Sequence, residues 1–360
     1  MRLAAVELRR LRLPLRAGGW REVVLVRVET PDGDGWGECA ALGEPSYTAE
    51  YAAGAQAVLQ EWLAPAVLAA GDLDAAGVGP ALAGVRGHRM AKAALEMAVL
   101  DAELRAAGVP LAARLGATRT EVEAGVVLER AASVGALLDA VAAAVDEGWR
   151  RVKLKIGPGW DVEPVRTVRE RWPDLTLQVD ANGAYGPGDL AVLEALDAFA
   201  LAMVEQPLAA SDLLASATVA RRLRTPVCLD EAVTSAAAAE AALALGACSV
   251  VNVKPGRVGG YLEAVRVHDT CRAAGVPVWC GGMWETGLAR SANLALAALP
   301  GFTLPGDLSP PSRYLAADIA APLRASGGRL AVPTTAGAGA AVDLDSVERA
   351  TVVVLRVTPE

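Results

Sequence analysis

Residues 151–180 read RVKLKIGPGWDVEPVRTVRERWPDLTLQVD. Val, Leu and Ile are concentrated at the two ends of this stretch, which predicts strands over Arg151–Ile156 and Leu175–Asp180. The residues between them have the spacing and length of a helix, which we place over Glu163–Arg171. A strand, a helix and a second strand joined by short connections are typical of a parallel βαβ unit.

The same alternation continues on both sides of this unit, starting at about residue 122. Further strands are predicted over Val122–Leu128, Ala202–Glu205, Pro226–Asp230, Ser249–Lys254 and Val276–Cys280. Further helices are predicted over Ser133–Glu147, Gly188–Ala198, Ser211–Leu223, Ser235–Leu245 and Tyr261–Ala274. Seven strands in a row, with no break for a topological switch, favour a closed α/β barrel over an open sheet.

The N-terminal third of the chain has a different pattern. We expect strands over Leu3–Leu13, Glu22–Glu29 and Trp36–Cys39, and helices over Thr48–Leu63 and His88–Ala107. Beyond about Leu315 the chain is rich in Ala and Gly, and it ends in a strand-like run over Ala350–Val357. We expect that run to return to the N-terminal strands.

The composition limits the classes of protein to which this chain can belong. Hydrophobic residues make up 53% of the 360 residues, which is enough for a sizeable core. A formal net charge of −8 argues against a nucleic-acid partner. No run of about 18 apolar residues exists, so no membrane span is expected. Five Cys without a CxxC pair, and an N-terminus without a signal-peptide core, indicate a cytoplasmic protein.

Charged residues stand at the ends of five successive predicted strands: Lys155, Asp180, Glu205, Asp230 and Lys254. They are spaced by 25, 25, 25 and 24 residues, and one βα unit has about this length. We therefore expect them at similar heights at the carboxyl ends of the strands, where barrel enzymes keep their active sites. Lys153 should share a face with Lys155, because residues two apart on a strand point the same way.

Three carboxylates that converge at one barrel mouth repel one another, and a hard divalent cation such as Mg²⁺ relieves that repulsion. Lysines beside such a cation indicate proton transfer at the carbon next to a carboxylate, so a small-molecule carboxylate is the expected partner. Taken alone, each acidic residue could be a helix N-cap and each Lys a surface residue. The regular array favours a metal-centred site.

Only four of the 34 Lys and Arg residues are Lys, namely Lys92, Lys153, Lys155 and Lys254, and only two residues are His. Arg does not lose its proton in a protein, so general bases have few candidates in this chain. Three of the four Lys fall in the predicted site, which indicates that Lys is kept where a titratable amine is needed.

The motifs around these residues are Lys153-Leu-Lys155, Val-Asp180-Ala-Asn182-Gly, Val-Glu205-Gln-Pro, Leu-Asp230-Glu and Asn-x-Lys254-Pro-Gly-Arg257-x-Gly-Gly. Together they resemble the muconate-lactonizing-enzyme subgroup of the enolase superfamily, whose sites use a Lys or His base with Mg²⁺. The stretches GWGEC at 35–39, GHRMAKAALE at 87–96, GGMWETG at 281–287 and TLPGD at 303–307 resemble the o-succinylbenzoate synthase/N-succinylamino acid (N-acylamino acid) racemase family within it.

The resemblance covers nearly the whole chain and implies an α/β fold, a modified (β/α)7β TIM-type barrel under an α+β capping domain. The cap would take residues 1–118, the barrel with the metal and catalytic site residues 119–314, and residues 315–360 would be a tail that returns to the cap. A homo-oligomer is expected.

The resemblance also implies roles for single residues. Mg²⁺, or Mn²⁺ or another divalent ion in its place, would be bound by Asp180, Glu205 and Asp230. Lys155 would be the principal acid and base, and Lys254 would lie on the opposite face of the substrate. The substrate-binding residues would be Lys153, Asn182, Arg257, Gly282, Met283 and Trp284.

The implied activity is the Mg²⁺-dependent synthesis of o-succinylbenzoate, a menaquinone precursor, by dehydration of a cyclohexadiene carboxylate through an enediolate. The same site would also support N-succinylamino acid racemisation. A dedicated N-acylamino acid or N-succinylamino acid racemase is the alternative. A dipeptide epimerase is a weaker one, because residues 281–285 lack the Asp-x-Asp pattern of such enzymes.

A non-catalytic barrel is disfavoured, since every metal ligand and Lys of the pattern is present. Three features bear on the substrate rather than on the chemistry. Val127 stands where the family commonly has Ser, Trp284 stands where a smaller aliphatic residue is more usual, and the loop Arg16–Trp20 is short.

Overall fold

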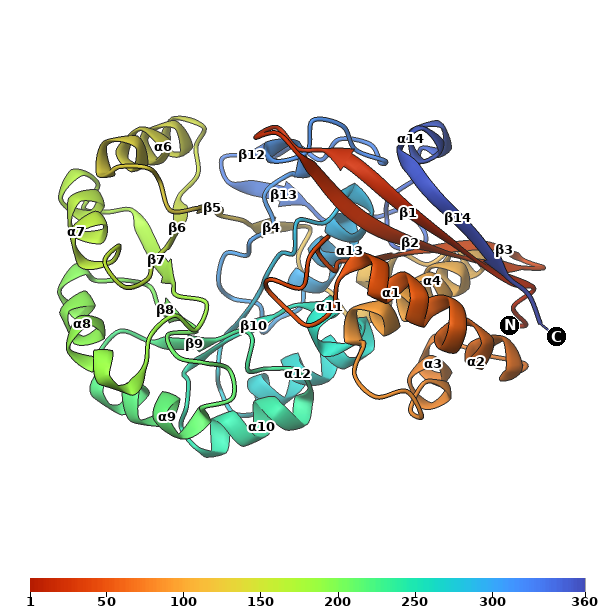
Figure 1. The fold of residues 1–360 in the computed structure, drawn as a ribbon, viewed down its shortest axis with the longest axis horizontal. Coiled ribbons are helices and arrows are strands. Elements are labelled where there is room, and N and C mark those ends of the chain that lie inside the picture. Colours follow the sequence, from red (N-terminus) through yellow and green to blue (C-terminus); the bar gives the residue numbers. More distant parts are fainter. Residues whose placement is uncertain (360) are drawn as a thin grey trace.

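The computed structural model describes residues 1–359, and its central feature is a curled sheet of seven parallel strands (Figure 1). The strands are β5 (Val126–Leu128), β6 (Arg151–Lys155), β7 (Thr176–Asp180), β8 (Val204–Glu205), β9 (Val227–Leu229), β10 (Val250–Val253) and β11 (Val278–Cys280). The strands lie side by side in sequence order, from β5 at one edge to β11 at the other. The prediction of seven consecutive parallel strands is thereby confirmed.

Helices follow the strands and cover the outside of the sheet (Figure 1). They are α6 (Val134–Asp146), α7 (Val162–Arg171), α8 (Leu190–Ala195), α9 (Leu213–Arg222), α10 (Ala236–Ala244), α11 (Pro255–Val258), α12 (Tyr261–Ala273) and α13 (Gly287–Ala297). The side chains of Ser133, Asp212 and Ser235 each accept a hydrogen bond from the backbone N–H three residues further on. These caps satisfy amides that the first helical turn leaves free, which fixes where the helices begin.

Residues 301–307 close the barrel, although they form no regular strand. On one side the Asp307 N–H donates to Cys280 O of β11 (2.9 Å). On the other side the Gly125 N–H donates to Gly306 O (2.8 Å). This segment takes the place of an eighth strand and brings the Asp307 side chain to the barrel mouth.

The predicted strand Val122–Leu128 is wrong in one respect, because it is two strands in two sheets. Its second half is β5, whereas its first half belongs to a small antiparallel sheet of β4 (Glu121–Glu123), β13 (Arg329–Ala331) and β12 (Ala325–Ser326). Gly125 lies at the break. A Cβ on Gly125 would lie 2.2 Å from Arg151 Cδ, so only Gly allows the chain to pass this close to β6.

A second, antiparallel sheet has the strand order β14-β1-β2-β3. Its strands are β1 (Ala5–Pro14), β2 (Trp20–Thr30), β3 (Gly33–Cys39) and β14 (Thr351–Val357). The C-terminal β14 pairs with the N-terminal β1, so the two ends of the chain meet in this sheet (Figure 1). We call this sheet and the helices α1–α5 the cap.

The longest helix of the cap, α4 (Arg89–Ala107), packs directly on β3. A Cβ on Gly35 or Gly37 would lie 2.0 Å from the carbonyl oxygen of Ala98 or Ala94. The two glycines of the GWGEC stretch are therefore needed because the α4 backbone touches the strand at these positions.

The predicted helix Thr48–Leu63 begins later and extends further than expected. It comprises α1 (Ala52–Val58), a π-helical turn over Leu59–Leu63 and α2 (Ala64–Ala69). Tyr51 has extended backbone and bridges to Leu42, which delays the helix start. The remaining cap helices are α3 (Ala75–Ala81) and α5 (Leu111–Leu115), and α14 (Leu344–Ala350) precedes β14. None of the helices in residues 1–359 has the length and apolar character that a bilayer crossing requires.

His268 on α12 supports the segment that closes the barrel. Its ring is buried and stacks on Phe302, with the ring centroids 5.4 Å apart. Its Nε2 accepts a hydrogen bond from Gly301 N–H (3.0 Å), and its Nδ1 lies 3.0 Å from Asp269 Oδ1. Burial lowers the pKa of His268, although Asp269 opposes that shift.

This lowered pKa predicts a pH dependence of stability. The folded state favours the neutral ring, so the contribution of His268 is complete above its unfolded-state pKa of about 6.5 and is lost as the pH falls below it. Between about pH 7.5 and pH 5, the wild type should lose unfolding free energy that His268→Gln retains, because a Gln oxygen still accepts from Gly301 and does not titrate. Urea unfolding at both pH values measures this. Equal losses in the two proteins would contradict the prediction.

Candidate active site

Three buried carboxylates lie at the carboxyl ends of three adjacent strands. Asp180 ends β7, Glu205 ends β8, and Asp230 directly follows β9. Each side chain is at most 1% exposed. Burial, reinforced by the charge of Asp180, raises the pKa of Glu205 to about 8. Burial also opposes ionisation of Asp230, but Arg257 and Lys254 hold the pKa of that carboxyl down at about 2.

The three predicted site lysines each contact one or more of these carboxylates. Lys155 Nζ donates to Asp180 Oδ2 (2.8 Å) and to Asn182 Oδ1 (2.6 Å). Lys153 Nζ, on the same strand, donates to Glu205 Oε2 (2.8 Å) and lies 3.3 Å from Asp180 Oδ2. Since both amines approach Asp180, the two lysines point to the same side of β6.

Lys254 completes the group from the opposite side of the barrel mouth. It directly follows β10, and three strands separate β10 from β6. Its Nζ donates to Asp230 Oδ2 (2.7 Å), and Arg257 Nε lies 3.3 Å from Asp230 Oδ1. In a curled sheet this separation places Lys254 across the barrel mouth from Lys155.

The three carboxylates are candidate ligands for a divalent cation. All three carboxylates supply oxygen, which hard cations such as Mg²⁺ prefer. Asp230 Oδ1 is buried and accepts no hydrogen bond, so it is an oxygen that a cation could engage. Burial, and next the charge of Asp180, raises the pKa of Glu205, and a bound cation would favour its charged form. Within residues 1–359 no three His, Cys, Asp or Glu side chains are arranged as a ready-made metal site, and ammonium groups of lysines lie among these carboxylates. The residues fit a divalent cation in chemistry and burial.

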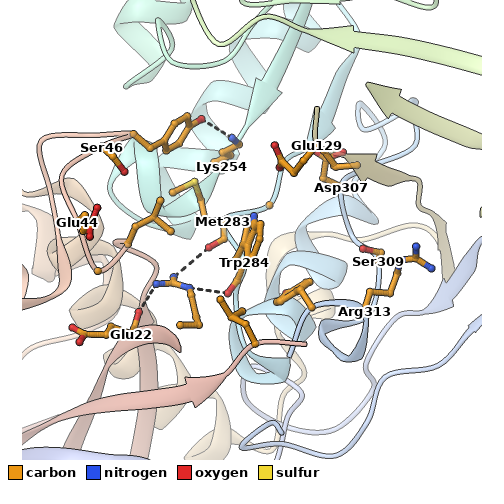
Figure 2. A pocket seen from close by; sticks show the side chains of 18 of the residues that line it. Glu22, Glu44, Ser46, Glu129, Lys254, Met283, Trp284, Asp307, Ser309 and Arg313 are labelled. Atoms are coloured by element: carbon orange, nitrogen blue, oxygen red, sulfur yellow. Dashed lines mark hydrogen bonds between the residues drawn. The ribbon is translucent and has the colours of Figure 1, made fainter. Parts of the chain in front are cut away.

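A cavity of about 1070 Å³ opens in front of these groups, between the cap and the barrel. Figure 2 shows Glu44 and Ser46 on one side of it and Glu129 and Asp307 opposite, with Trp284 between. Seven predicted site residues line the cavity: Lys153, Lys155, Asn182, Lys254, Gly282, Met283 and Trp284. The other four lie behind this lining and contact it: Asp180, Glu205, Asp230 and Arg257.

Tyr47 is a site residue that the sequence did not reveal. It comes from the cap loop before α1, where no motif or periodicity marks it. Its hydroxyl donates to Asp230 Oδ2 (3.0 Å) and accepts from Lys254 Nζ (3.0 Å) and Arg257 Nη2 (2.6 Å). The cap therefore contributes directly to the position of Lys254.

Asp307 is the second residue that was missed, although it ends the TLPGD stretch. Its carboxylate is buried and lies 2.5 Å from both Lys153 Nζ and Arg151 Nη1. Burial opposes the charge on Lys153, but Asp307 and Glu205 raise the pKa of its amine well above the usual value. These two carboxylates therefore favour the charged form of Lys153. The signal that could have identified Asp307 is its position at the end of the TLPGD stretch.

Two family models match the chain in tandem. The mandelate racemase/muconate lactonizing enzyme N-terminal domain matches residues 4–116, and the enolase C-terminal domain-like model matches residues 136–346. The solved structure of an enolase superfamily member from Listeria innocua superposes with a TM-score of 0.95 at 35% identity, and covers 99% of both chains.

Curated relatives cover almost the same span. The N-succinylamino acid racemase of an Amycolatopsis species is 56% identical over 350 residues, 95% of each chain. The o-succinylbenzoate synthase of Geobacillus kaustophilus is 44% identical over 333 residues, 92% of this chain and 89% of that protein. The resemblance inferred from the motifs is thereby confirmed. The chain belongs to the enolase superfamily, in its mandelate racemase/muconate lactonizing enzyme group.

Proposed function

We propose that this chain is an o-succinylbenzoate synthase that also racemises N-succinylamino acids at the same site. The observation that carries the proposal is the pair Lys155 and Lys254, two amines that line one cavity from strands on opposite sides of the barrel mouth. Buried carboxylates lie directly behind both amines. Relatives named for each of the two reactions, at 56% and 44% identity, support the same pair of activities.

In racemisation, one neutral Lys amine removes the proton from the α-carbon, and the electron pair of the broken C–H bond stays on the substrate. The other Lys, as ammonium, delivers a proton to the opposite face and forms the new C–H bond. Hydrogen bonds to Asn182 and Tyr47 hold the two amines in place. Asp307 and Glu205 favour the charged form of Lys153, which attracts the substrate carboxylate.

In the synthase reaction, one Lys performs both proton transfers. Lys155 removes the α-proton and then gives a proton to the departing hydroxide, so that the C–O bond breaks, water leaves and the ring becomes aromatic. Lys254 keeps its charge and stabilises the anion that forms between the two steps. The same two amines therefore support both reactions with different roles.

We propose Mg²⁺ as the cation that Asp180, Glu205 and Asp230 hold. When bound, it would supply a positive charge that stabilises the substrate carboxylate as that group gains negative charge. Lys153 would add to this effect from β6.

Parallel assays test the proposal. The purified protein with Mg²⁺ is given the cyclohexadiene substrate, and separately an N-succinyl-L-amino acid in D₂O. We expect o-succinylbenzoate in the first assay, and loss of optical rotation with deuterium at the α-carbon in the second. Racemisation without dehydration would assign the second candidate, a dedicated racemase, which the name of the 56% identical relative favours. Inactivity on both substrates would overturn the proposal.

A further inference from the structure

Two buried charged side chains of the cap reach across to one segment of the barrel. Arg21 lies on β2 and Glu38 on β3, and they are 3% and 5% exposed. The segment is Met283–Gly287, which connects β11 to α13 and lines the cavity through Met283 and Trp284. Neither charged residue contacts the three carboxylates or the lysines described above.

Arg21 uses its guanidinium entirely on backbone carbonyl groups. Nε donates to Trp284 O (3.1 Å) and Nη2 to Met283 O (3.2 Å). Dashed lines that end at the labelled Met283 and Trp284 mark these two bonds in Figure 2. The remaining bonds go to the cap itself: Glu22 O, Ala40 O (2.9 Å) and Ala41 O (2.7 Å). A buried cation is costly unless it is hydrogen-bonded, and here one cation ties the backbones of the cap and the barrel together.

Glu38 holds the other end of the same segment. Its carboxylate accepts from Thr286 N–H (3.0 Å), from Thr286 Oγ1 (2.5 Å) and from Ala289 N–H (3.4 Å). These groups form the first turn of α13, where a negative charge is favoured. Arg21 thus binds carbonyl groups before the helix, and Glu38 binds amide groups at its start.

Trp284, between these two anchors, has a backbone that is costly for a non-glycine residue. Its φ is +59°, in the left-handed region, and its side chain is 42% exposed at the cavity. The indole packs on Tyr314 at 5.5 Å, tilted by 41°. Such backbone persists only when surrounding contacts hold it, and Arg21 binds the carbonyl group of this very residue.

We infer that Arg21 and Glu38 are positioning residues that set the substrate-binding wall of the cavity, by fixing Met283–Thr286 and the left-handed Trp284 from the cap. The identity of the substrate used to test this rests on the proposed function. Because neither residue touches a reacting amine, releasing the wall should weaken substrate binding more than it slows proton transfer.

Hydrogen–deuterium exchange by mass spectrometry on the full chain tests whether Arg21 and Glu38 restrain the wall. The variants are Arg21→Met, Arg21→Lys and Glu38→Gln. A peptide spanning residues 281–290 should exchange about tenfold faster in Arg21→Met and Glu38→Gln, with peptides from β6–β9 unchanged. Arg21→Lys should fall between them and the wild type, because Lys has three donors on one atom and cannot span carbonyl groups of both units.

Kinetics with an N-succinylamino acid test the consequence. We expect KM to rise about tenfold in Arg21→Met, with kcat within threefold of the wild type. Asp101→Asn is the matched control, since Asp101 is a buried cap carboxylate that accepts from Trp36 N–H, Ala338 N–H and Arg105 Nε, and none of these groups belongs to the wall. This control should leave KM unchanged.

The exchange and kinetic results can each contradict the inference. Unchanged exchange at residues 281–290, or faster exchange throughout the barrel, overturns the inference. So does an equal rise of KM in Asp101→Asn, or a fall of kcat without a change of KM. If Arg21→Met does not fold, Arg21→Lys and Glu38→Gln carry the same comparison. Wild-type inactivity on the succinyl substrate would overturn the proposed function, while the exchange data would still decide whether Arg21 and Glu38 hold the wall.

Discussion

Lys155→Ala is expected to lower kcat for both reactions by about 10²- to 10⁴-fold, because a positioned general acid and base contributes about that much. Lys254→Ala should lower racemisation to the same extent but the synthase reaction by less, since Lys254 acts there through charge alone. Steady-state kinetics on the two substrates measure the difference. The unequal effect of Lys254→Ala is the specific result, because a merely structural Lys would affect both reactions alike.

Isotope exchange separates the two lysines further. In D₂O, each single variant should still exchange the α-proton of one enantiomer of an N-succinylamino acid, because one base remains on one face. The two variants should prefer opposite enantiomers. Lys92→Ala is the matched control, since Lys92 lies on α4 of the cap and its Nζ donates to Val85 O. Exchange of both enantiomers by both variants would show that the two lysines are not the bases.

The barrel was predictable because its strands are short apolar runs separated by helices of regular length. Each observed strand from β6 to β11 lies within a predicted run, but is shorter at one or both ends. The errors occur where tertiary contacts decide. The predicted strand is divided at Gly125, where the side chain of Arg151 leaves no space for a Cβ. Residues 301–307 pair with their neighbours without the sequence pattern of a strand.

The site residues of the barrel were likewise predictable from the sequence, whereas those of the cap were not. Lys155, Asp180 and Glu205 end their strands in the structure, and regular spacing alone indicated where they would lie. Tyr47 and Arg21 could not be found in this way, because they come from the cap and reach the barrel only through tertiary contacts. The regular spacing of residues reflects the repeated βα unit of the barrel. It carries no information about contacts between the barrel and the cap.

Metal removal should have the second large effect. Treatment with a chelator is expected to lower both activities by about 10²-fold or more. A cation that stabilises developing charge contributes several kcal/mol to the barrier, and each 1.36 kcal/mol is about tenfold in rate. Mg²⁺ should restore the activity. It should also raise the unfolding free energy by about 2.7 kcal/mol at a concentration of about 100 times its Kd, because it binds only the folded state.

Glu205→Gln tests whether the three carboxylates are the ligands without relying on activity. Glu205 is fully buried, and its carboxylate contacts Lys153, Gln178 and Asn252, so an amide of the same shape can keep part of this network. The variant should fold, yet Mg²⁺ should no longer raise its thermal midpoint. Asp101→Asn also alters a buried carboxylate but lies in the cap, and it should retain the full Mg²⁺ effect. If Mg²⁺ stabilised Glu205→Gln as strongly as the wild type, the cation would have to bind elsewhere, and the three carboxylates would not be its ligands.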